Sequence, residues 1–237
     1  MNDQDRERAW ELFGLLFQAH PWHGIAIGAG APAVVTAYIE IVPTDTVKYE
    51  IDKASGHLKV DRPQQFSNVC PTLYGFLPQT FCGERVAAYG FSAGEAGHGG
   101  RAVVEGDGDP MDICVLSERS FSHGDTLLQA VPVGGLRLID RGQADDKIVA
   151  VLKGDAAYGH CEEIGDLPRA LIDRLRHYFL TYKRPPGAEL EAVQITSVYG
   201  AAEAREVIER SRADYEERYP RLRERFVEAL RQGVGGE

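Results

Sequence analysis

The chain is poor in several features that mark common protein classes, beginning with positive charge. Its 237 residues hold 26 lysines and arginines against 36 aspartates and glutamates, which gives a net charge of −10. No stretch of the sequence is strongly basic. Because phosphate backbones and anionic membrane surfaces attract positive protein surfaces, we expect neither a nucleic-acid partner nor a membrane partner.

Cysteine is also scarce, and it is spaced without a pattern. The four cysteines stand at positions 70, 82, 114 and 161, with no C-x-x-C pair among them. Closely spaced pairs are typical of zinc sites, and disulfide frameworks are typical of small secreted domains. The scattered cysteines therefore favour free thiols in a reducing compartment and predict a cytoplasmic protein.

Long apolar runs are missing as well. The longest one near the start, residues 12–17, is much shorter than the roughly 20 residues that a membrane-spanning helix needs. Acidic residues precede it at positions 3, 5 and 7, whereas a signal peptide begins with basic ones. We therefore expect no membrane span and no secretion signal.

What the chain does have is enough length for one full hydrophobic core, with no linker in its interior. Residues 5–18 carry apolar side chains at about a 3.6-residue period, which predicts an amphipathic helix. We divide the chain into an N-terminal helix and extension (residues 1–32), a β-rich domain (33–200) that contains one helix (167–183), and a C-terminal helical extension (201–237).

From residue 33 the apolar period changes to two, which is typical of strands. Strands are predicted at residues 34–42, 47–52, 57–62, 113–116, 126–139 and 147–153. A turn at 53–56 joins the second and third of these into a hairpin. Residues 71–78 contain two prolines and predict a kinked edge segment, and residues 81–105 predict a further β-hairpin with a flexible tip.

Two helices are predicted in the last third of the chain. The first opens at Asp166, a residue type that favours N-caps, and is stopped by the prolines at 185 and 186. The second begins at 201 and continues past Pro220 to 232, with glutamates and arginines at helical spacing. We expect this second helix to be solvated and ion-paired, either covering the strands or extending from them.

The most informative stretch is the acidic segment at residues 106–112. Asp107, Asp109 and Asp112 fall within six residues, in a sequence whose two glycines and proline predict a turn that enters the strand at 113–116. Crowded carboxylates are costly unless cations neutralise them. The segment is therefore either a solvated acidic turn or a cation site.

A calcium loop is a second interpretation of the same residues. Asp107, Asp109 and Glu118 occupy positions 1, 3 and 12 of an EF-hand register, but position 6, where the sharp turn needs glycine, holds Asp112. The spacing therefore argues against an EF-hand.

Other charged and aromatic residues occur around this segment in a distinctive order over about 145 residues. They are Glu40, Lys48-Tyr49-Glu50, Val60-Asp61-Arg62, Tyr74-Gly75-Phe76, Asp107-Gly108-Asp109-Pro110-Met111-Asp112, the loop from Asp140 to Lys147, and Tyr182-Lys183. In this order and spacing the chain resembles the family I soluble inorganic pyrophosphatases. The resemblance implies a mainly β (α+β) fold, a small closed OB-type β-barrel with flanking α-helices, and an active site at the barrel mouth.

The resemblance also implies a role for each matching residue. Asp109 matches the general base, and Glu40 a supporting acid. The metal-binding positions match Glu50, Asp107, Asp112, Asp140 and Asp145. The positions that hold the two phosphoryl groups match Lys48, Arg62, Tyr74, Lys147, Tyr182 and Lys183. If the loop is shifted by one residue, Asp146 takes the place of Asp145.

The chemistry of this set agrees with the resemblance. Its metal ligands are all oxygens, which favours a hard cation, Mg²⁺ first and Mn²⁺ as a substitute. Seven carboxylates against four cationic side chains leave the site anionic, so pyrophosphate could enter only together with metal ions, which would also acidify the attacking water. The expected partners are therefore pyrophosphate as substrate and, by the resemblance, further copies of the chain in a homo-oligomer.

Two other functions stay open at this stage. One is a non-catalytic OB barrel that binds calcium or an oligosaccharide, and the other is a hydrolase of a different phosphoanhydride, such as a nucleotide or polyphosphate. The sequence shows no P-loop and no base-stacking platform, although a missing motif is weak evidence.

Overall fold

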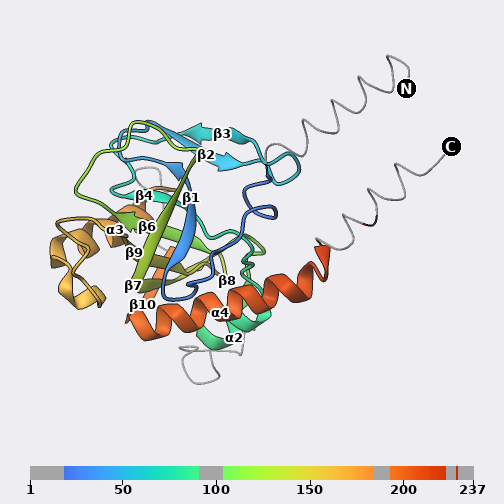
Figure 1. Cartoon of the computed structure of the whole chain (residues 1–237). Coiled ribbons are helices and arrows are strands. Elements are labelled where there is room, and N and C mark those ends of the chain that lie inside the picture. The colour runs from blue at the N-terminus through green and yellow to red at the C-terminus, as the bar shows by residue number, and fades with distance from the viewer. Residues whose placement is uncertain (1–18, 91–103, 184–192, 223–227, 229–237) are drawn as a thin grey trace, which may run out of the picture.

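The computed structural model describes residues 19–90, 104–183, 193–222 and 228 (Figure 1). Within these residues the chain forms ten strands, three α-helices and one 3-10 helix. The strands are β1 (Val35–Ile41), β2 (Val47–Ile51), β3 (Leu58–Pro63), β4 (Leu73–Phe76), β5 (Glu105–Gly106), β6 (Asp112–Leu116), β7 (Thr126–Asp140), β8 (Gln143–Ala144), β9 (Lys147–Leu152) and β10 (Val193–Gly200). The helices are α2 (Glu84–Gly90), η1 (Ile164–Asp166), α3 (Arg169–Thr181) and α4 (Ala201–Arg218).

Five strands close into a ring, in the order β1, β4, β6, β9, β7 and back to β1. Within the ring β6 and β9 run parallel, and the other neighbours are antiparallel. The 15-residue β7 makes the closure possible, because its first part pairs with β1 and its middle with β9, across a register shift between Pro132 and Gly134. The predicted mainly β fold with an OB-type barrel is confirmed.

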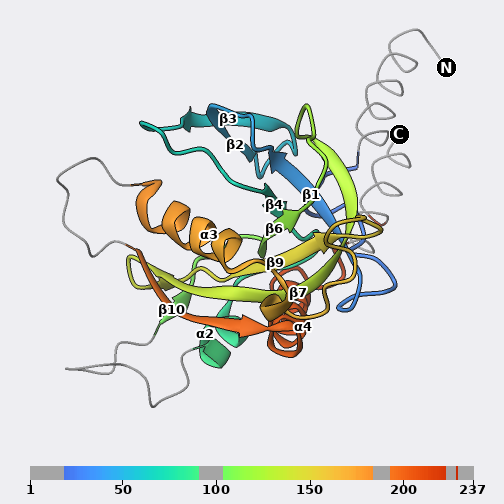
Figure 2. The ribbon, with the colours of Figure 1, turned by 90° about the vertical axis from the view of Figure 1, so that its left-hand side faces the viewer.

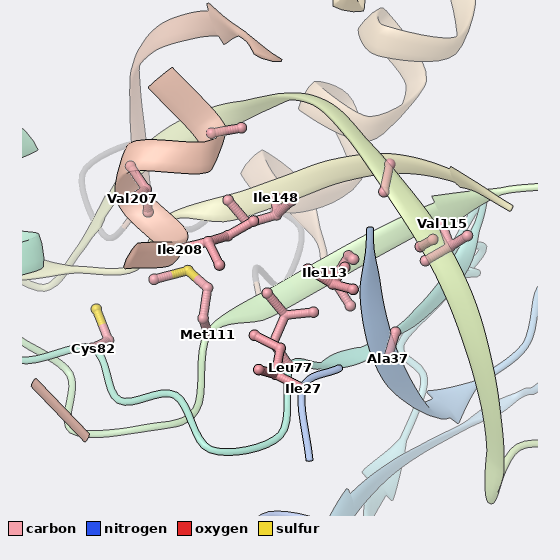
Figure 3. Close-up of a cluster of buried hydrophobic side chains, with 14 of the residues drawn as sticks. Ile27, Ala37, Leu77, Cys82, Met111, Ile113, Val115, Ile148, Val207 and Ile208 are labelled. Atoms are coloured by element: carbon pink, nitrogen blue, oxygen red, sulfur yellow. The ribbon is translucent and has the colours of Figure 1, made fainter. Parts of the chain in front are cut away.

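Both faces of the ring are covered, which explains the continuous apolar run of β6. Ile113 and Val115 belong to a core cluster shared with α2 and α4, whereas Cys114 and Leu116 belong to a second cluster shared with α3. Figure 3 shows the first cluster, in which Val207 and Ile208 of α4 lie over the strands. A strand buried on both faces cannot show the alternating pattern of a half-exposed one.

The β2–β3 hairpin forms a separate two-stranded sheet at one end of the molecule, and α2 and α4 lie at the opposite end (Figures 1 and 2). The sequence predicted this hairpin at nearly the observed residues. It also predicted β1, β6, β7 and β9 at nearly their observed positions. None of the described helices is both long and apolar enough to cross a lipid bilayer.

The predicted β-hairpin at 81–105 is wrong, because its first half is the helix α2. The Asp214 carboxylate of α4 accepts hydrogen bonds from the amides of Gly83, Arg85 and Val86, at 3.1, 3.1 and 3.2 Å, and so caps this helix. Such a cap comes from about 130 residues further along the chain, where no local pattern reveals it. Residues 91–103, which include the whole predicted flexible tip at 92–100, lie outside the described part.

The predicted edge segment at 71–78 is also wrong. Its strand, β4, pairs with β1 on one side and with β6 on the other, and all four of its residues are buried. The two prolines stand outside the strand, so they remove no ladder hydrogen bond. At Gly75 a Cβ atom would lie 1.9 Å from the carbonyl oxygen of Tyr38, so only glycine permits the close approach of β1.

The helix predictions are partly confirmed. The first helix begins at Arg169 after Pro168, and Asp166 instead accepts hydrogen bonds from the amides of Glu162 and Glu163. Helix α4 occupies 201–218 as predicted, but Ala204, Val207 and Ile208 bury one side of it against the barrel. The strand β10 was not predicted. The N-terminal helix at 5–18 and most of residues 223–237 lie outside the described part, and the division into three regions stays a prediction.

Candidate active site

A cavity of about 290 Å³ opens among β1, β2, the β5–β6 loop and the ends of β7 and α3. Asp112 is the first residue of β6 and Lys147 the first of β9, and the two are partners in the parallel pairing. Strand pairing therefore brings residues 35 positions apart to the same end of the barrel. Twelve of the thirteen predicted site residues line the cavity: Glu40, Lys48, Glu50, Tyr74, Asp107, Asp109, Asp112, Asp140, Asp145, Lys147, Tyr182 and Lys183.

Arg62 is the predicted residue that is not among the cavity-lining residues. Its guanidinium carbon lies 5.8 Å from the centre of the Tyr182 ring, and Nη1 bonds to Asp61. Its other terminal nitrogen, Nη2, is buried without a hydrogen-bond partner. A buried guanidinium nitrogen without a partner is a donor available to an oxyanion bound nearby.

The local sequence explains how the acidic segment enters the cavity. Gly106 packs so closely that a Cβ atom would lie 2.1 Å from the carbonyl oxygen of Cys82, and Gly108 has a φ of +78°. The turn brings the amide of Asp109 to 3.0 Å from Oδ1 of Asp107, which accepts its hydrogen bond. Both glycines are therefore required by the geometry that presents the carboxylates.

Ammonium groups lie between the carboxylates. The ion pairs are Lys147 with Asp112 and Asp145, Lys48 with Glu50 and Asp61, Lys183 with Asp140, and Lys53 with Asp109. In this arrangement no three acidic, cysteine or histidine side chains of the described residues converge as a metal-ion cage. The lysines neutralise the acids in place of other cations.

Lys147 is the most buried of these cations. Burial alone would lower the pKa of its ammonium group, but the charges of Asp112 and Asp145 outweigh burial and hold that pKa well above its usual value. Asp112 also accepts a hydrogen bond of 2.6 Å from the Tyr74 hydroxyl. These contacts fix Asp112 and Lys147 at the base of the cavity.

Burial raises the pKa values of several acids in and around the cavity, among them Asp107 and Glu40. Burial, helped by the neighbouring charge of Asp145, raises the pKa of Asp107 to about 8. Burial also raises the pKa of Glu40 to about 8, although Glu40 accepts a 2.6 Å hydrogen bond from the amide of Ile51. Glu40 thereby ties β1 to β2, which carries Lys48 and Glu50. Its contacts suit a supporting role.

The residues fit a hard cation. All of the acids that line the cavity offer oxygen, which Mg²⁺ and Mn²⁺ prefer. Asp140 has a buried Oδ1 atom without a hydrogen-bond partner, although its other oxygen pairs with Lys183. A buried carboxylate oxygen without a hydrogen-bond partner destabilises the folded protein unless a positively charged group lies nearby.

The two adjacent aspartates in the Asp140–Lys147 loop point in different directions. Asp145 lines the cavity and pairs with Lys147. Asp146 is not a lining residue, and it contacts Tyr199 and Arg137 instead. The geometry favours Asp145 over Asp146 as the residue available to a bound cation.

Sequence reasoning missed Lys53, Arg141 and Gln143, which also line the cavity. Lys53 lies in the turn of the β2–β3 hairpin, three residues after Glu50. Its position could have been inferred from the hairpin, since a hairpin that contributes Lys48 and Glu50 to a site also brings its turn near the site. No local signal indicates Gln143.

The fold and the cavity define a class of protein, an OB-type barrel whose cavity is lined by acidic oxygens and ammonium groups and so suits hard cations and an oxyanion. A family profile described as inorganic pyrophosphatase matches residues 37–216. An inorganic pyrophosphatase of Chlamydia muridarum is 48% identical over 200 residues, which cover 83% of this chain and 93% of that protein. The soluble inorganic pyrophosphatase of Oryza sativa subsp. indica is 38% identical over 172 residues, 73% of this chain and 69% of that protein.

The crystal structure of an inorganic pyrophosphatase from Thermus thermophilus has the same fold. It matches with a TM-score of 0.66 and 28% identity, over 84% of this chain and 99% of that one. The chain belongs to the inorganic pyrophosphatase family, and it is a hydrolase.

Proposed function

We propose that the chain hydrolyses inorganic pyrophosphate to two orthophosphates with Mg²⁺, for which Mn²⁺ can substitute. The observation that supports the proposal is the single cavity in which acidic oxygens and ammonium groups alternate. Such a site suits a substrate that is itself a polyanion accompanied by divalent cations. Membership of the family supports the same reaction.

The carboxylates and the cations have separate roles in this proposal. Glu50, Asp107, Asp112, Asp140 and Asp145 would hold the metal ions, which when bound would neutralise phosphoryl charge and lower the pKa of the attacking water. Once the carboxylates are so engaged, the ammonium groups are free to bind phosphoryl oxygens. The residues that hold the phosphoryl groups are Lys48, Arg62, Tyr74, Lys147, Tyr182 and Lys183, and those near the leaving phosphate stabilise its growing charge.

Asp109 is the general base in this mechanism. Its side chain is 47% exposed, more than that of Asp112 at 21% or Asp145 at 10%. A carboxylate at the mouth keeps access to the incoming water and to bulk solvent, so it can accept the water's proton and pass it on.

The decisive test is phosphate release from pyrophosphate by the purified chain, with ATP as the comparison substrate. The proposal predicts rapid release from pyrophosphate and much slower release from ATP. Faster release from ATP would favour a nucleotide hydrolase, and calcium or oligosaccharide binding without any phosphate release would favour a binding protein.

Metal removal is expected to abolish turnover. Activity should return with Mg²⁺, return in part with Mn²⁺, and stay low with Ca²⁺, whose larger and looser coordination shell positions water and substrate poorly. The measurement is phosphate release after chelation and readdition of each ion. Full activity of a chelator-treated sample would contradict the metal-dependent mechanism.

Lys53→Met is expected to raise the KM for pyrophosphate by about threefold to tenfold, because solvent screens a half-exposed ammonium group at the cavity mouth and limits its attraction for the substrate. Lys59→Met is the matched control. Lys59 lies in the same hairpin with a side chain 52% exposed against 54% for Lys53, and it pairs with Asp52 outside the cavity. Equal KM values for the two variants would show that Lys53 has no role in substrate binding.

We also infer that the enzyme works in the cytoplasm and as a homo-oligomer. All four cysteines are buried and free, which suits a reducing compartment. Apolar side chains such as Phe66, 68% exposed, and Val60, 60% exposed, would be better covered in an assembly. Sedimentation analysis measures the number of subunits directly.

A further inference from the structure

A cluster of charged and polar side chains, most of them buried, lies behind the cavity at the start of β9. Asp146 stands between Asp145 and Lys147, which both line the cavity, and its own side chain is directed away from it. Asp146 is 3% exposed. Its Oδ2 accepts a hydrogen bond of 3.1 Å from the Tyr199 hydroxyl and lies 3.5 Å from Nε of Arg137.

Arg137 connects this aspartate to a helix. It projects from β7, is 8% exposed, and pairs through Nη1 with Oε1 of Glu203 in α4 at 2.8 Å. Its guanidinium carbon also lies 5.0 Å from the centre of the Tyr199 ring. We call Arg137, Asp146, Tyr199 and Glu203 the Asp146 cluster. It joins β7, β10 and α4 to the connection between β8 and β9.

The surrounding backbone is shaped to admit the cluster. A Cβ atom at Gly135 would lie 2.3 Å from Cζ of Tyr199, and one at Gly90 would lie 2.8 Å from Nε of Arg137. Two glycines of different elements therefore make room for these two side chains. The Tyr199 hydroxyl reaches Asp146 because Gly135, the residue of β7 that pairs with Tyr199, has no side chain in its way.

The cluster is not built for stability alone. A buried ion pair is often no better than apolar side chains of the same size, because desolvation offsets the attraction. Here Oδ1 of Asp146 and Nη2 of Arg137 are both buried without hydrogen-bond partners, which adds to the cost. None of the four residues lines the cavity.

We propose that Asp146 is a positioning residue, which holds the Asp145–Lys147 segment so that the Asp145 carboxylate and the Lys147 ammonium group stay directed into the cavity. The inference rests on the proposed function, in which Asp145 binds a metal ion and Lys147 a phosphoryl group. Backbone hydrogen bonds set the path of this segment, through the Asp145 amide to the Leu138 carbonyl at 3.0 Å and the pairing of β9 with β6 and β7. The Asp146 cluster adds side-chain contacts, and these fix the direction in which the side chains of the Asp145–Lys147 segment point.

The test compares two variants with a matched control. Tyr199→Phe removes one hydroxyl and keeps the packed ring, and Asp146→Asn removes the charge that faces Arg137. Tyr215→Phe is the control, because its buried hydroxyl bonds to Nδ1 of His23 at 2.8 Å, and neither residue lines the cavity. Mg²⁺ affinity is measured by calorimetry on the metal-free proteins, kcat and KM by phosphate release, and the thermal midpoint by circular dichroism.

Loss of a residue that orients a metal ligand typically costs 10-fold to 100-fold in metal affinity or activity. We expect Asp146→Asn to weaken Mg²⁺ binding by about that factor, Tyr199→Phe by about threefold to tenfold, and Tyr215→Phe by less than twofold. KM should rise in the first two variants, since Lys147 moves with Asp145. The double variant should cost less than the two single effects combined, because both changes act on the contacts of the same Asp146 carboxylate.

Two results would overturn the proposal. If Asp146→Asn and Tyr199→Phe lower the thermal midpoint but keep the Mg²⁺ affinity and KM of Tyr215→Phe, the cluster is only structural. If Asp146→Asn abolishes Mg²⁺ binding while Asp145→Asn leaves it intact, Asp146 is itself a ligand. The unchanged chain is first assayed with pyrophosphate. If it releases no phosphate, the proposed function is wrong, and this outcome is distinct from the two results that would overturn the role of Asp146.

Discussion

Replacement of Asp109 by asparagine is expected to slow pyrophosphate hydrolysis by about 10²–10⁴-fold, the usual contribution of a general base, while Mg²⁺ affinity stays close to that of the unchanged chain. Asparagine has nearly the same shape but cannot take the proton of the attacking water. The half-exposed Asp109 side chain pairs with Lys53 at the mouth, whereas Asp112 lies deeper, between Tyr74 and Lys147.

Asp112→Asn is the comparison variant. It removes the carboxylate charge that Lys147 and the Tyr74 hydroxyl both contact, so it should weaken Mg²⁺ binding as well as slow the reaction. Calorimetric titration of Mg²⁺ and phosphate release at saturating Mg²⁺ separate the two effects. If extra Mg²⁺ restored full turnover to Asp109→Asn, Asp109 would be a metal ligand and another group would be the base.

Lys147→Met is expected to be the most destabilising change at the site when no metal is present. The Lys147 side chain is 2% exposed, and it separates the carboxylates of Asp112 and Asp145. Removal of one partner from a buried ion pair typically lowers the free energy of unfolding by about 3–5 kcal/mol. Turnover should fall at least tenfold even at saturating Mg²⁺, because a hydrogen bond to a charged group contributes about 1.5–3 kcal/mol.

Mg²⁺ should restore much of the lost stability of Lys147→Met, because divalent cations can neutralise the same carboxylates. Urea unfolding with and without Mg²⁺ measures this. Lys153→Met is the control, since Lys153 is exposed just after β9 and bonds to Oε1 of Gln129 at 3.2 Å. If both variants unfolded at the same urea concentration without Mg²⁺, Lys147 would not be the group that keeps the two acids together.

The sequence predicts the ring strands with alternating or continuous apolar patterns, because those patterns follow from which faces are covered. It fails where a contact from a distant segment decides the structure. Asp214 makes a helix of residues 84–90, and Tyr38 makes Gly75 part of a central strand, although both stretches look like edges or hairpins locally. β10 was missed, although it pairs with β7 over its whole length.

The residues of the candidate site, like the strands, could be predicted from the sequence only in part. Twelve of the thirteen residues indicated by the family resemblance line one cavity, because the parallel pairing of β6 with β9 aligns their first residues. Lys53 was missed although the hairpin that carries Lys48 and Glu50 indicates its position. Gln143 could not be identified, since its position depends on how a short strand folds over the cavity. The roles of all these residues stay predictions. The Asp146 cluster depends on side chains from three elements and the β8–β9 connection, which only the three-dimensional structure brings together.

Because β7 closes the ring, the order in which the strands are synthesised determines when the barrel can fold on the ribosome. β1 pairs with β4 on one side and with β7 on the other, and β7 lies about 90 residues downstream in the chain. Until β7 and β9 have been synthesised, the nascent protein therefore presents unpaired strand edges beside apolar side chains, a state prone to aggregation. The ring can close only after Leu152 has emerged, and the cavity wall that carries Tyr182 and Lys183 is added later still.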